Sequence, residues 1–292
     1  MLKKYKAIFF DWDGTAVLSR RAPVTDAAEA MKPLLRQGIK LVIVSGTTIE
    51  NIAQGKLEEL FEKEELANLY LGLGRGAYNY AFDDGGKAYI FQDEIPDKEK
   101  LLQIHRICFE IHQRLLEQYD YETDIVFSRP NYCKIDLMVK ESRGANLFMQ
   151  ANELDMLKET MRGCGLDGGL QEMIGLAKEA GRRFQVDVVP TCDAKYLEVG
   201  ISSKSDNVNA ILQKLENDFG IRAEDCAFWG DEYVGIEPGI FGSDSFMKTN
   251  RTENGDFFDV SEVPGDRPER VTVVGGGVER FLDFLRRQAE VS

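Results

Sequence analysis

The sequence predicts an α/β fold in which a doubly wound, parallel-sheet core is split by an inserted α+β domain. Towards both ends of the chain, short and continuously apolar segments alternate with amphipathic helical segments. That alternation is typical of a parallel sheet covered by helices on both faces. The middle of the chain instead combines long amphipathic helices with strands in which apolar and polar residues alternate, which favours an open sheet with one face on helices.

The elements of the predicted core follow in chain order. The first part predicts strands at Ala7–Phe10, Lys40–Val44 and Tyr70–Gly72, a helix at Thr25–Gln37 and another that begins near Thr48. The second part repeats this texture. It predicts a helix at Val208–Leu215, strands at Ala227–Trp229, Ser245–Met247 and Val271–Val274, an irregular loop at Asn250–Arg270 and a helix at Val278–Gln288.

The predicted insert covers residues 86–190, so that the core consists of residues 1–85 and 191–292. Apolar residues at three- and four-residue spacing from Leu101 to Leu115, and again from Leu147 to Met161, predict two helices. Two-residue alternation over Tyr132–Val139 and Phe184–Val188 predicts strands.

Composition limits the class of protein. With 292 residues, 43% of them hydrophobic, the chain is long enough for one large or two ordinary domains. A net charge of −14 disfavours nucleic acid and anionic membranes as partners, since both select basic surfaces. No apolar run has the length of a membrane span, and no signal-type segment follows Lys3 and Lys4. We therefore expect a cytoplasmic protein, and the sequence predicts no particular oligomeric state.

Cysteine and histidine do not indicate a site. The five cysteines form an odd set without the spacing of a metal finger, which favours reduced packing residues over a disulfide framework. Only two histidines, His105 and His112, are present, and no third ligand stands at a spacing suited to zinc.

The most informative segment is Asp11–Thr15, which directly follows an apolar strand. Side chains two residues apart in an extended chain point to the same side, so Asp11 and Asp13 can face one pocket, while Gly14 lets the backbone turn close to a ligand. Two neighbouring carboxylates repel one another unless a cation or a shared proton intervenes. The pattern favours a divalent metal and an anionic substrate, with one Asp as nucleophile and the other as proton carrier. An Asp-rich turn is the alternative.

Three further segments can join this one. The second strand ends in Ser45 and Gly46, where a hydroxyl and free amides at a helix start suit a phosphate, or serve as an ordinary helix cap. Lys204 precedes a helix and can offset phosphate charge, although a lysine there is commonly solvent-facing. Asp231 and Glu232 follow another buried strand. Since ligands collect at the carboxyl ends of strands in open α/β sheets, all these residues can share one crevice.

The order Asp-x-Asp-Gly-Thr, Ser-Gly-Thr, a lysine before a helix, and Gly-Asp-Glu resembles the four motifs of the haloacid dehalogenase (HAD) superfamily of phosphohydrolases. The resemblance implies a Rossmann-like core and covers both split parts. The insert lies between the second and third motifs. In that position it is similar to the type IIB cap of Cof-like phosphatases, sucrose- and trehalose-phosphate phosphatases and eukaryotic-type phosphomannomutases.

The resemblance implies roles for the motif residues. Asp11 would be the nucleophile that forms an aspartyl-phosphate, and Asp13 would protonate the leaving group and then activate water. Mg²⁺ would bind Asp11, the backbone carbonyl of Asp13, and Asp231. The phosphoryl oxygens would be held by Thr15, Ser45, Gly46 and Lys204. These roles suit phosphoryl transfer, which depends on in-line positioning and on neutralising the equatorial oxygens.

One position departs from the HAD pattern. Many relatives carry a second Asp four residues after the first acid of the last motif, and Gly235 stands there in this chain. The pattern favours the adjacent Glu232 as the replacement metal ligand, with Glu237 and Asp244 as weaker candidates.

The leading hypothesis is therefore a Mg²⁺-dependent phosphatase that hydrolyses a small phosphorylated metabolite, with a sugar phosphate as the first guess. Two alternatives stay open. The first is a phosphomannomutase-like phosphomutase, which would bind a second phosphate. The second is a catalytically silent HAD-fold binding or regulatory protein, for which Gly235 is the supporting observation. Polar contacts to the substrate could come from charged residues of the insert, although solvated surface charges are the norm. These residues are Arg129, Lys134, Arg182 and Arg183.

Overall fold

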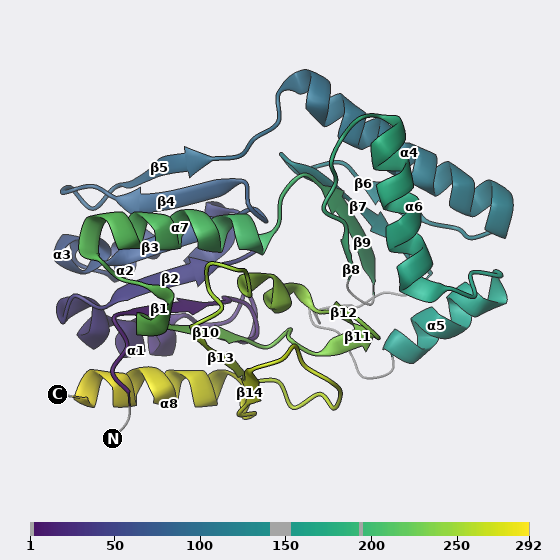
Figure 1. Ribbon diagram of the computed structural model, residues 1–292. Coiled ribbons are helices and arrows are strands. Elements are labelled where there is room, and N and C mark those ends of the chain that lie inside the picture. Colours follow the sequence, from purple (N-terminus) through teal and green to yellow (C-terminus); the bar gives the residue numbers. More distant parts are fainter. Residues whose placement is uncertain (1–2, 141–152, 193–194, 292) are drawn as a thin grey trace. The chain divides into compact units, whose positions relative to one another are not determined.

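The structure is a computed structural model that describes residues 3–140, 153–192 and 195–291 (Figure 1). The chain divides into two compact units, each of which is described by itself. The core unit contains Met1–Glu94, Lys204–Val234 and Asp244–Ser292, and the insert unit contains Ile95–Ser203 and Gly235–Ser243. Among the helices of the described ranges, none combines the length and the apolar character needed to cross a bilayer.

A mixed sheet forms the centre of the core unit. Over the described residues its strand order is β14-β13-β10-β1-β2-β3-β4-β5. Neighbouring strands from β14 to β3 run parallel, and β4 and β5 continue antiparallel. The strands are β1 (Ala7–Phe10), β2 (Lys40–Val44), β3 (Leu69–Leu73), β4 (Tyr78–Phe82), β5 (Ala88–Asp93), β10 (Cys226–Gly230), β13 (Asp256–Asp259) and β14 (Val271–Val273). The predicted α/β class with a mainly parallel core sheet is confirmed.

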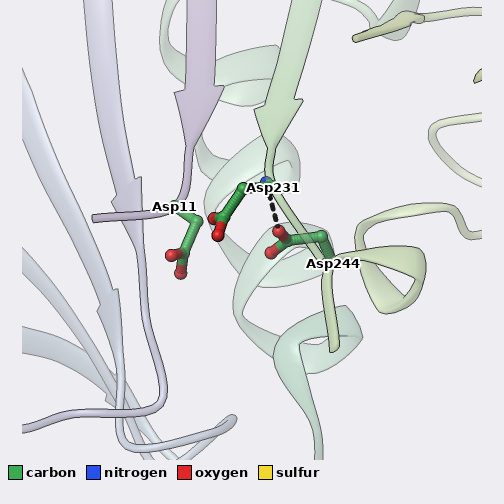
Figure 2. Close-up of side chains that lie close together, drawn as sticks. All are labelled: Asp11, Asp231 and Asp244. Carbon is green, nitrogen blue, oxygen red and sulfur yellow. Dashed lines mark hydrogen bonds between the residues drawn. The ribbon is translucent and has the colours of Figure 1, made fainter. Parts of the chain in front are cut away.

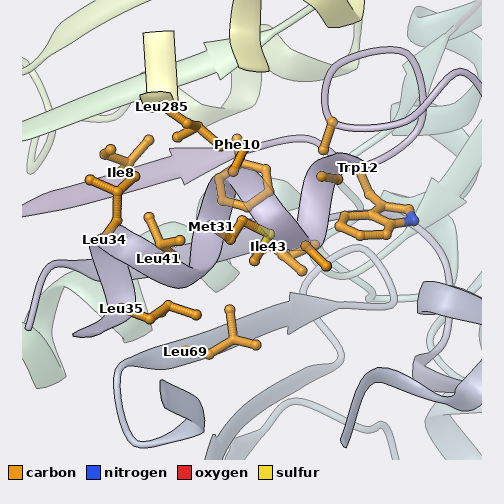
Figure 3. Packing of buried hydrophobic residues seen from close by; sticks show 14 of the residues in the cluster. Ile8, Phe10, Trp12, Met31, Leu34, Leu35, Leu41, Ile43, Leu69 and Leu285 are labelled. Atoms are coloured by element: carbon orange, nitrogen blue, oxygen red, sulfur yellow. The ribbon is translucent and has the colours of Figure 1, made fainter. Parts of the chain in front are cut away.

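Helices cover both faces of this sheet. Helices α1 (Thr25–Arg36) and α8 (Gly277–Glu290) pack with Ile8 and Phe10 of β1 in one buried cluster (Figure 3). The intervening residue of β1 packs with α7 (Lys204–Phe219) in a second cluster. Because successive side chains of a strand point to opposite faces, an apolar strand such as β1 is anchored by both layers. Packing on both faces therefore fixes the point at which the acidic motif leaves the sheet.

Shorter elements complete the core unit. They are the α-helical turns α2 (Leu57–Leu60) and α3 (Lys63–Leu66), and the 3-10 segments η1 (Ile49–Gly55), η2 (Ala223–Asp225) and η3 (Ser243–Met247).

Three core segments differ from the sequence prediction. The helix expected from Thr48 is broken, because Ala53–Gln54 adopts left-handed φ values of 49° and 56°. The strand expected at Ser245–Met247 is instead the end of η3, since a short apolar run does not distinguish a strand from a helix. Strand β13 lies within the segment expected to be an irregular loop, because its polar ends mask its buried centre.

The insert unit is an α+β unit built on an antiparallel sheet of order β6-β7-β9-β8 within the described residues. Cys133 and Ile135 of β7 pack with helices α4 and α6 in a buried cluster, so one face of the sheet is covered by helices, as expected. The elements are α4 (Lys98–Tyr119), β6 (Asp124–Val126), β7 (Tyr132–Asp136), α5 (Glu153–Gly163), α6 (Gly169–Arg183), β8 (Thr191–Cys192) and β9 (Tyr196–Gly200).

Two predicted insert elements have different outcomes. Phe184–Val188, expected as a strand, is a turn and coil after α6. Its alternation arises because Val186 and Val188 bury their side chains in the helix-covered cluster without strand pairing. The helix expected from Leu147 to Met161 is described only in its second part, as α5, since residues 147–152 lie outside the described ranges.

The division of the chain differs from the boundaries at residues 86 and 190. Strand β5 pairs with β4 and so continues the core sheet to Asp93. At the other boundary, β8 and β9 belong to the insert sheet because β9 pairs with β7. Residues 235–243 also belong to the insert unit, where β11 (Gly235–Glu237) and β12 (Ile240–Phe241) form an antiparallel hairpin.

Candidate active site

Two acidic residues leave adjacent strands of the core sheet at the same edge. Asp11 follows β1 and Asp231 follows β10 (Figure 2), and these strands pair in parallel with Phe10 opposite Trp229. The Asp11 N–H donates to the Trp229 carbonyl at 3.0 Å, which extends the pairing by one residue. The parallel register therefore brings the two carboxylates together from positions 220 residues apart in sequence.

A third acid, Asp244, joins them from the 3-10 segment η3. Carboxylate oxygens of Asp11, Asp231 and Asp244 all lie within 4.8 Å of one another. Asp11 and Asp244 are buried, at 6% and 0% exposure. Among the described residues, this is the cluster of acidic, histidine and cysteine side chains whose geometry suits a metal ion.

The position of Asp244 is fixed by backbone amides. Its Oδ2 accepts hydrogen bonds from the N–H groups of Asp231 at 2.9 Å and Glu232 at 2.8 Å, the first of which is drawn in Figure 2. A Cβ atom at Gly230 would overlap the Asp244 carboxylate, so glycine at the end of β10 is required for this close approach.

Lys204 is the cation of the cluster. As the first residue of α7 it is 6% exposed, and its Nζ lies 2.7 Å from Asp11 Oδ1 and 2.7 Å from Asp244 Oδ1. Although burial lowers the pKa of Lys204, the charges of Asp11 and Asp244 outweigh burial and hold that pKa well above its usual range. The two acids therefore favour the charged form of the ammonium group, which bridges them.

The glycine and threonine of the first motif serve the same cluster. Thr15 is fully buried, and its Oγ1 donates a hydrogen bond of 2.9 Å to Asp231 Oδ1. Gly14 adopts a φ of +90°, and a Cβ atom there would overlap the Asp231 carboxylate. The turn after β1 therefore packs directly on the second acid.

Asp13 lies outside the three-acid cluster and has its own partner. Arg20 Nη2 lies 3.2 Å from Asp13 Oδ2, while Asp13 Oδ1 is buried without a hydrogen bond. Burial raises the pKa of Asp13, and Arg20 offsets part of that rise. One carboxyl oxygen is thus held by Arg20, while the other is buried without a hydrogen bond.

Ser45 and Gly46 follow β2, the strand next to β1. Ser45 is 4% exposed, and its N–H extends the sheet by donating to the Gly72 carbonyl at 2.9 Å. Its Oγ accepts a long hydrogen bond of 3.4 Å from the Thr47 N–H. Gly46 is exposed, with nothing within 4 Å of the position of a Cβ atom. Both residues lie at the same sheet edge as Asp11.

The predicted replacement for the missing second acid differs from the observed cluster. Glu232, which the spacing favours, contributes its backbone N–H to Asp244, and its side chain is not part of the three-acid cluster. Glu237 lies in the insert unit. Asp244, the weaker candidate, belongs to the three-acid cluster and stands where the chain re-enters the core unit after residues 235–243.

The acids carry more negative charge than Lys204 can neutralise. Burial raises the pKa of Asp11, and the neighbouring Asp244 adds to this rise while Lys204 opposes it. Burial likewise raises the pKa of Asp231, with further contributions from Asp244 and Glu232. Three carboxylates facing one ammonium group form a hard, all-oxygen donor set with excess negative charge. That set fits a divalent cation such as Mg²⁺.

The charged residues singled out in the insert have different surroundings. Lys134 pairs with Glu198 at 2.6 Å on the polar side of the insert sheet and lies 4.9 Å from the Tyr196 ring centroid. Arg183 pairs with Glu110 on α4. Arg182 is exposed and Arg129 is half-buried. Lys134 therefore lies on the insert sheet between a carboxylate and an aromatic ring.

Two residues that contact the site carry weak signals in the sequence. Arg20 could have been found by its position shortly after the Asp-x-Asp motif, in a turn that returns to pair Asp13 with Val17. Asp244 carries a weaker signal, since it stands 13 residues after Asp231 and fits no fixed spacing.

Comparison with known proteins gives the family. A family model described as haloacid dehalogenase-like hydrolase matches residues 8–237. No curated protein matches the chain in sequence.

Solved structures share the fold at low identity. Sucrose-phosphatase from Synechocystis sp., in complex with sucrose and phosphate, matches with a TM-score of 0.52 and 14% identity over 98% of this chain and 98% of its own. Trehalose-6-phosphate phosphatase from Aspergillus fumigatus matches with a TM-score of 0.59 and 14% identity over 99% of this chain and 94% of its own. An N-terminally truncated, IMP-bound IMP-nucleotidase from Plasmodium falciparum matches with a TM-score of 0.60 and 13% identity over 99% of this chain and 69% of its own. Since the family model spans most of the sequence, the chain belongs to the haloacid dehalogenase-like hydrolases.

Proposed function

We propose that this hydrolase is a Mg²⁺-dependent phosphatase that acts on a small phosphorylated metabolite through an aspartyl-phosphate on Asp11. The observation that carries the proposal is the convergence of three carboxylates and one buried ammonium group at the end of β1. Such a set neutralises a phosphoryl group and presents an oxygen nucleophile to it, which are the main requirements of phosphoryl transfer.

Asp11 is the proposed nucleophile. Its Oδ1 is held by Lys204, so the side chain has a fixed orientation. In the first step, a carboxylate oxygen of Asp11 attacks phosphorus, and the bond from phosphorus to the leaving oxygen breaks. Lys204, the backbone amide of Gly46 and the hydroxyl of Ser45 are the proposed ligands of the phosphoryl oxygens. The buried Thr15 hydroxyl donates to Asp231 and is proposed to orient that acid instead.

Asp13 is the proposed proton carrier. Its unsatisfied Oδ1 can give a proton to the leaving oxygen and later take one from the water that hydrolyses the aspartyl-phosphate. The raised pKa of Asp13 favours the protonated form needed in the first step. Arg20 keeps the group in place during both transfers.

Mg²⁺ is the proposed cofactor, held by Asp11, Asp231 and Asp244 with the Asp13 carbonyl. When bound, it supplies positive charge that offsets the charge on the transferring phosphoryl group. In this proposal Asp244 takes the place of the acid missing at Gly235, which supports an active phosphatase over a silent binding protein.

A sugar phosphate is the first substrate to test. Two of the similar structures are named as phosphatases of sugar phosphates, and a third is named as an IMP-nucleotidase. In this chain, Lys134 and Glu198 place a cation and a carboxylate side by side on the polar face of the insert sheet. Paired charges of this kind suit the hydroxyl groups of a sugar, which both donate and accept hydrogen bonds.

The test is a screen of phosphorylated metabolites with the purified protein, in which released inorganic phosphate is measured with Mg²⁺ and with EDTA. The expected result is Mg²⁺-dependent release from at least one sugar phosphate. Loss of turnover in Asp11→Asn, with turnover retained in the exposed control Asp26→Asn, is also expected. Release that persists in EDTA and in Asp11→Asn would overturn the proposal, and isomerisation of a sugar bisphosphate without net release would favour the phosphomutase.

A further inference from the structure

The chain between two acids of the site leaves the core unit. Asp231 and Asp244 belong to the core unit, while the intervening Gly235–Ser243 belongs to the insert unit. Ile236 and Ile240 of this hairpin are 3% and 7% exposed and lie in the hydrophobic cluster of the insert unit. The hairpin is therefore built into the insert and is not a surface loop of the core.

Polar contacts anchor the hairpin at the amino-terminal end of α6. Glu237 Oε1 accepts a hydrogen bond of 3.0 Å from the Leu170 N–H, and Gln171 Nε2 donates to the Pro238 carbonyl at 3.0 Å. A Cβ atom at Gly169 would press on the Glu237 carboxylate. A carboxylate at this position satisfies an amide without a helical partner and interacts favourably with the helix dipole. Glu237 thus binds the hairpin to a stable element of the insert.

The residues that flank the hairpin in the chain hydrogen-bond to one another within the core unit. The Asp244 N–H donates to the Glu232 carbonyl at 3.2 Å, and the Asp244 carboxylate accepts the amides of Asp231 and Glu232. Asp244 is therefore restrained by hydrogen bonds within the core unit, and the hairpin directly precedes it in the chain.

We propose that the hairpin positions Asp244 for metal binding and that Glu237 is its positioning residue. This inference rests on the proposed Mg²⁺ site. With the hairpin ordered, the chain between Asp231 and Asp244 has fewer conformations to lose, and the three acids are arranged before the cation arrives. Without the anchor, the loop samples more conformations, only a fraction of which can bind, and the apparent affinity falls by that fraction.

The experiment compares Glu237→Ala with Glu172→Ala. Glu172 is a matched control because its carboxylate accepts the Gly168 N–H at 3.1 Å and the Tyr119 hydroxyl at 2.8 Å, at the same end of α6, and neither partner belongs to the hairpin. Titration calorimetry measures Mg²⁺ affinity without substrate. Amide hydrogen exchange at Asp231 and Glu232, in protein without metal, reports whether Asp244 still accepts their hydrogen bonds.

Glu237→Ala is expected to weaken Mg²⁺ binding by about fivefold and to speed exchange at both amides. Glu172→Ala is expected to leave both unchanged. Glu237→Gln should restore much of the affinity, since its amide oxygen still accepts the Leu170 N–H. Gln171→Ala provides a second, milder release of the hairpin should Glu237→Ala fail to fold.

Unchanged affinity and exchange in folded Glu237→Ala or Gln171→Ala would overturn the inference, as would an equal loss in Glu172→Ala. These results would leave the proposed function intact. By contrast, the absence of Mg²⁺ binding in the unsubstituted protein would overturn the metal site itself and this inference with it.

Discussion

Replacing Lys204 with methionine tests the electrostatic balance of the site. The side chain is 7% exposed and lies 2.7 Å from carboxylates that are 9% and 0% exposed, those of Asp11 and Asp244. Removing one partner of a buried ion pair costs about 3–5 kcal/mol, because the remaining charge is buried without compensation. For a unit of this size, each kcal/mol lowers the thermal midpoint by roughly 2–4 °C. We therefore expect Lys204→Met to lower the midpoint by about 6–20 °C in EDTA.

The matched control is Lys214→Met, which removes a lysine from the same helix. Lys214 pairs with Asp218 at 2.8 Å, but the two side chains are 26% and 42% exposed, so the expected cost is about 0.5 kcal/mol. Differential scanning calorimetry measures both variants in EDTA and in Mg²⁺. Because a divalent cation can replace the lost positive charge, Mg²⁺ should recover part of the loss in Lys204→Met and leave Lys214→Met unchanged. Equal thermal midpoints for the two variants in EDTA would show that Lys204 does not stabilise the buried acids.

Three further predictions concern catalysis and pH. Asp11→Asn should reduce kcat by on the order of 10³-fold or more while the circular dichroism spectrum is retained; a modest loss would exclude Asp11 as the nucleophile. Because the pKa values of Asp11 and Asp231 are raised by burial, the metal-free folded protein binds more protons than the unfolded chain. Its thermal midpoint should therefore fall as pH rises above the ordinary Asp value of 3.8. Saturating Mg²⁺ or Asp11→Asn should reduce this slope, and an unchanged slope in both would contradict the assignment. Arg20→Met removes the charge that lowers the pKa of Asp13, so the alkaline limb of the kcat/KM profile should move to higher pH; a stationary limb would count against Asp13 as the acid.

Much of the core could be predicted from the sequence because its signals are local. An apolar run such as Ala7–Phe10 can only be buried, and the residues that follow it must leave the sheet at its carboxyl edge. The same reasoning applies to Asp231 after β10 and to Ser45 after β2. Since parallel neighbours end at the same edge, local patterns were sufficient to predict that these residues gather there.

What could not be predicted depends on contacts between distant segments. Asp244 is separated from Asp231 in the chain by residues 235–243, which belong to the insert unit. Ile236 and Ile240 of this segment lie in the hydrophobic cluster of that unit. Strand β13 carries Asp at both ends, and its place is decided by Phe257 stacking 4.8 Å from Phe228. Neither fact is visible as a periodicity in the sequence. Spacing alone therefore favours Glu232 as the third metal ligand, and it favours a loop in place of β13.

Acid-quenched trapping of the phosphorylated protein during turnover, followed by peptide mass spectrometry, identifies the nucleophile. One phosphoryl group is expected on Asp11, lost once the substrate is consumed and absent from Asp11→Asn. A phosphoryl group on another residue, or turnover in which Asp11 is never phosphorylated, would contradict Asp11 as the nucleophile.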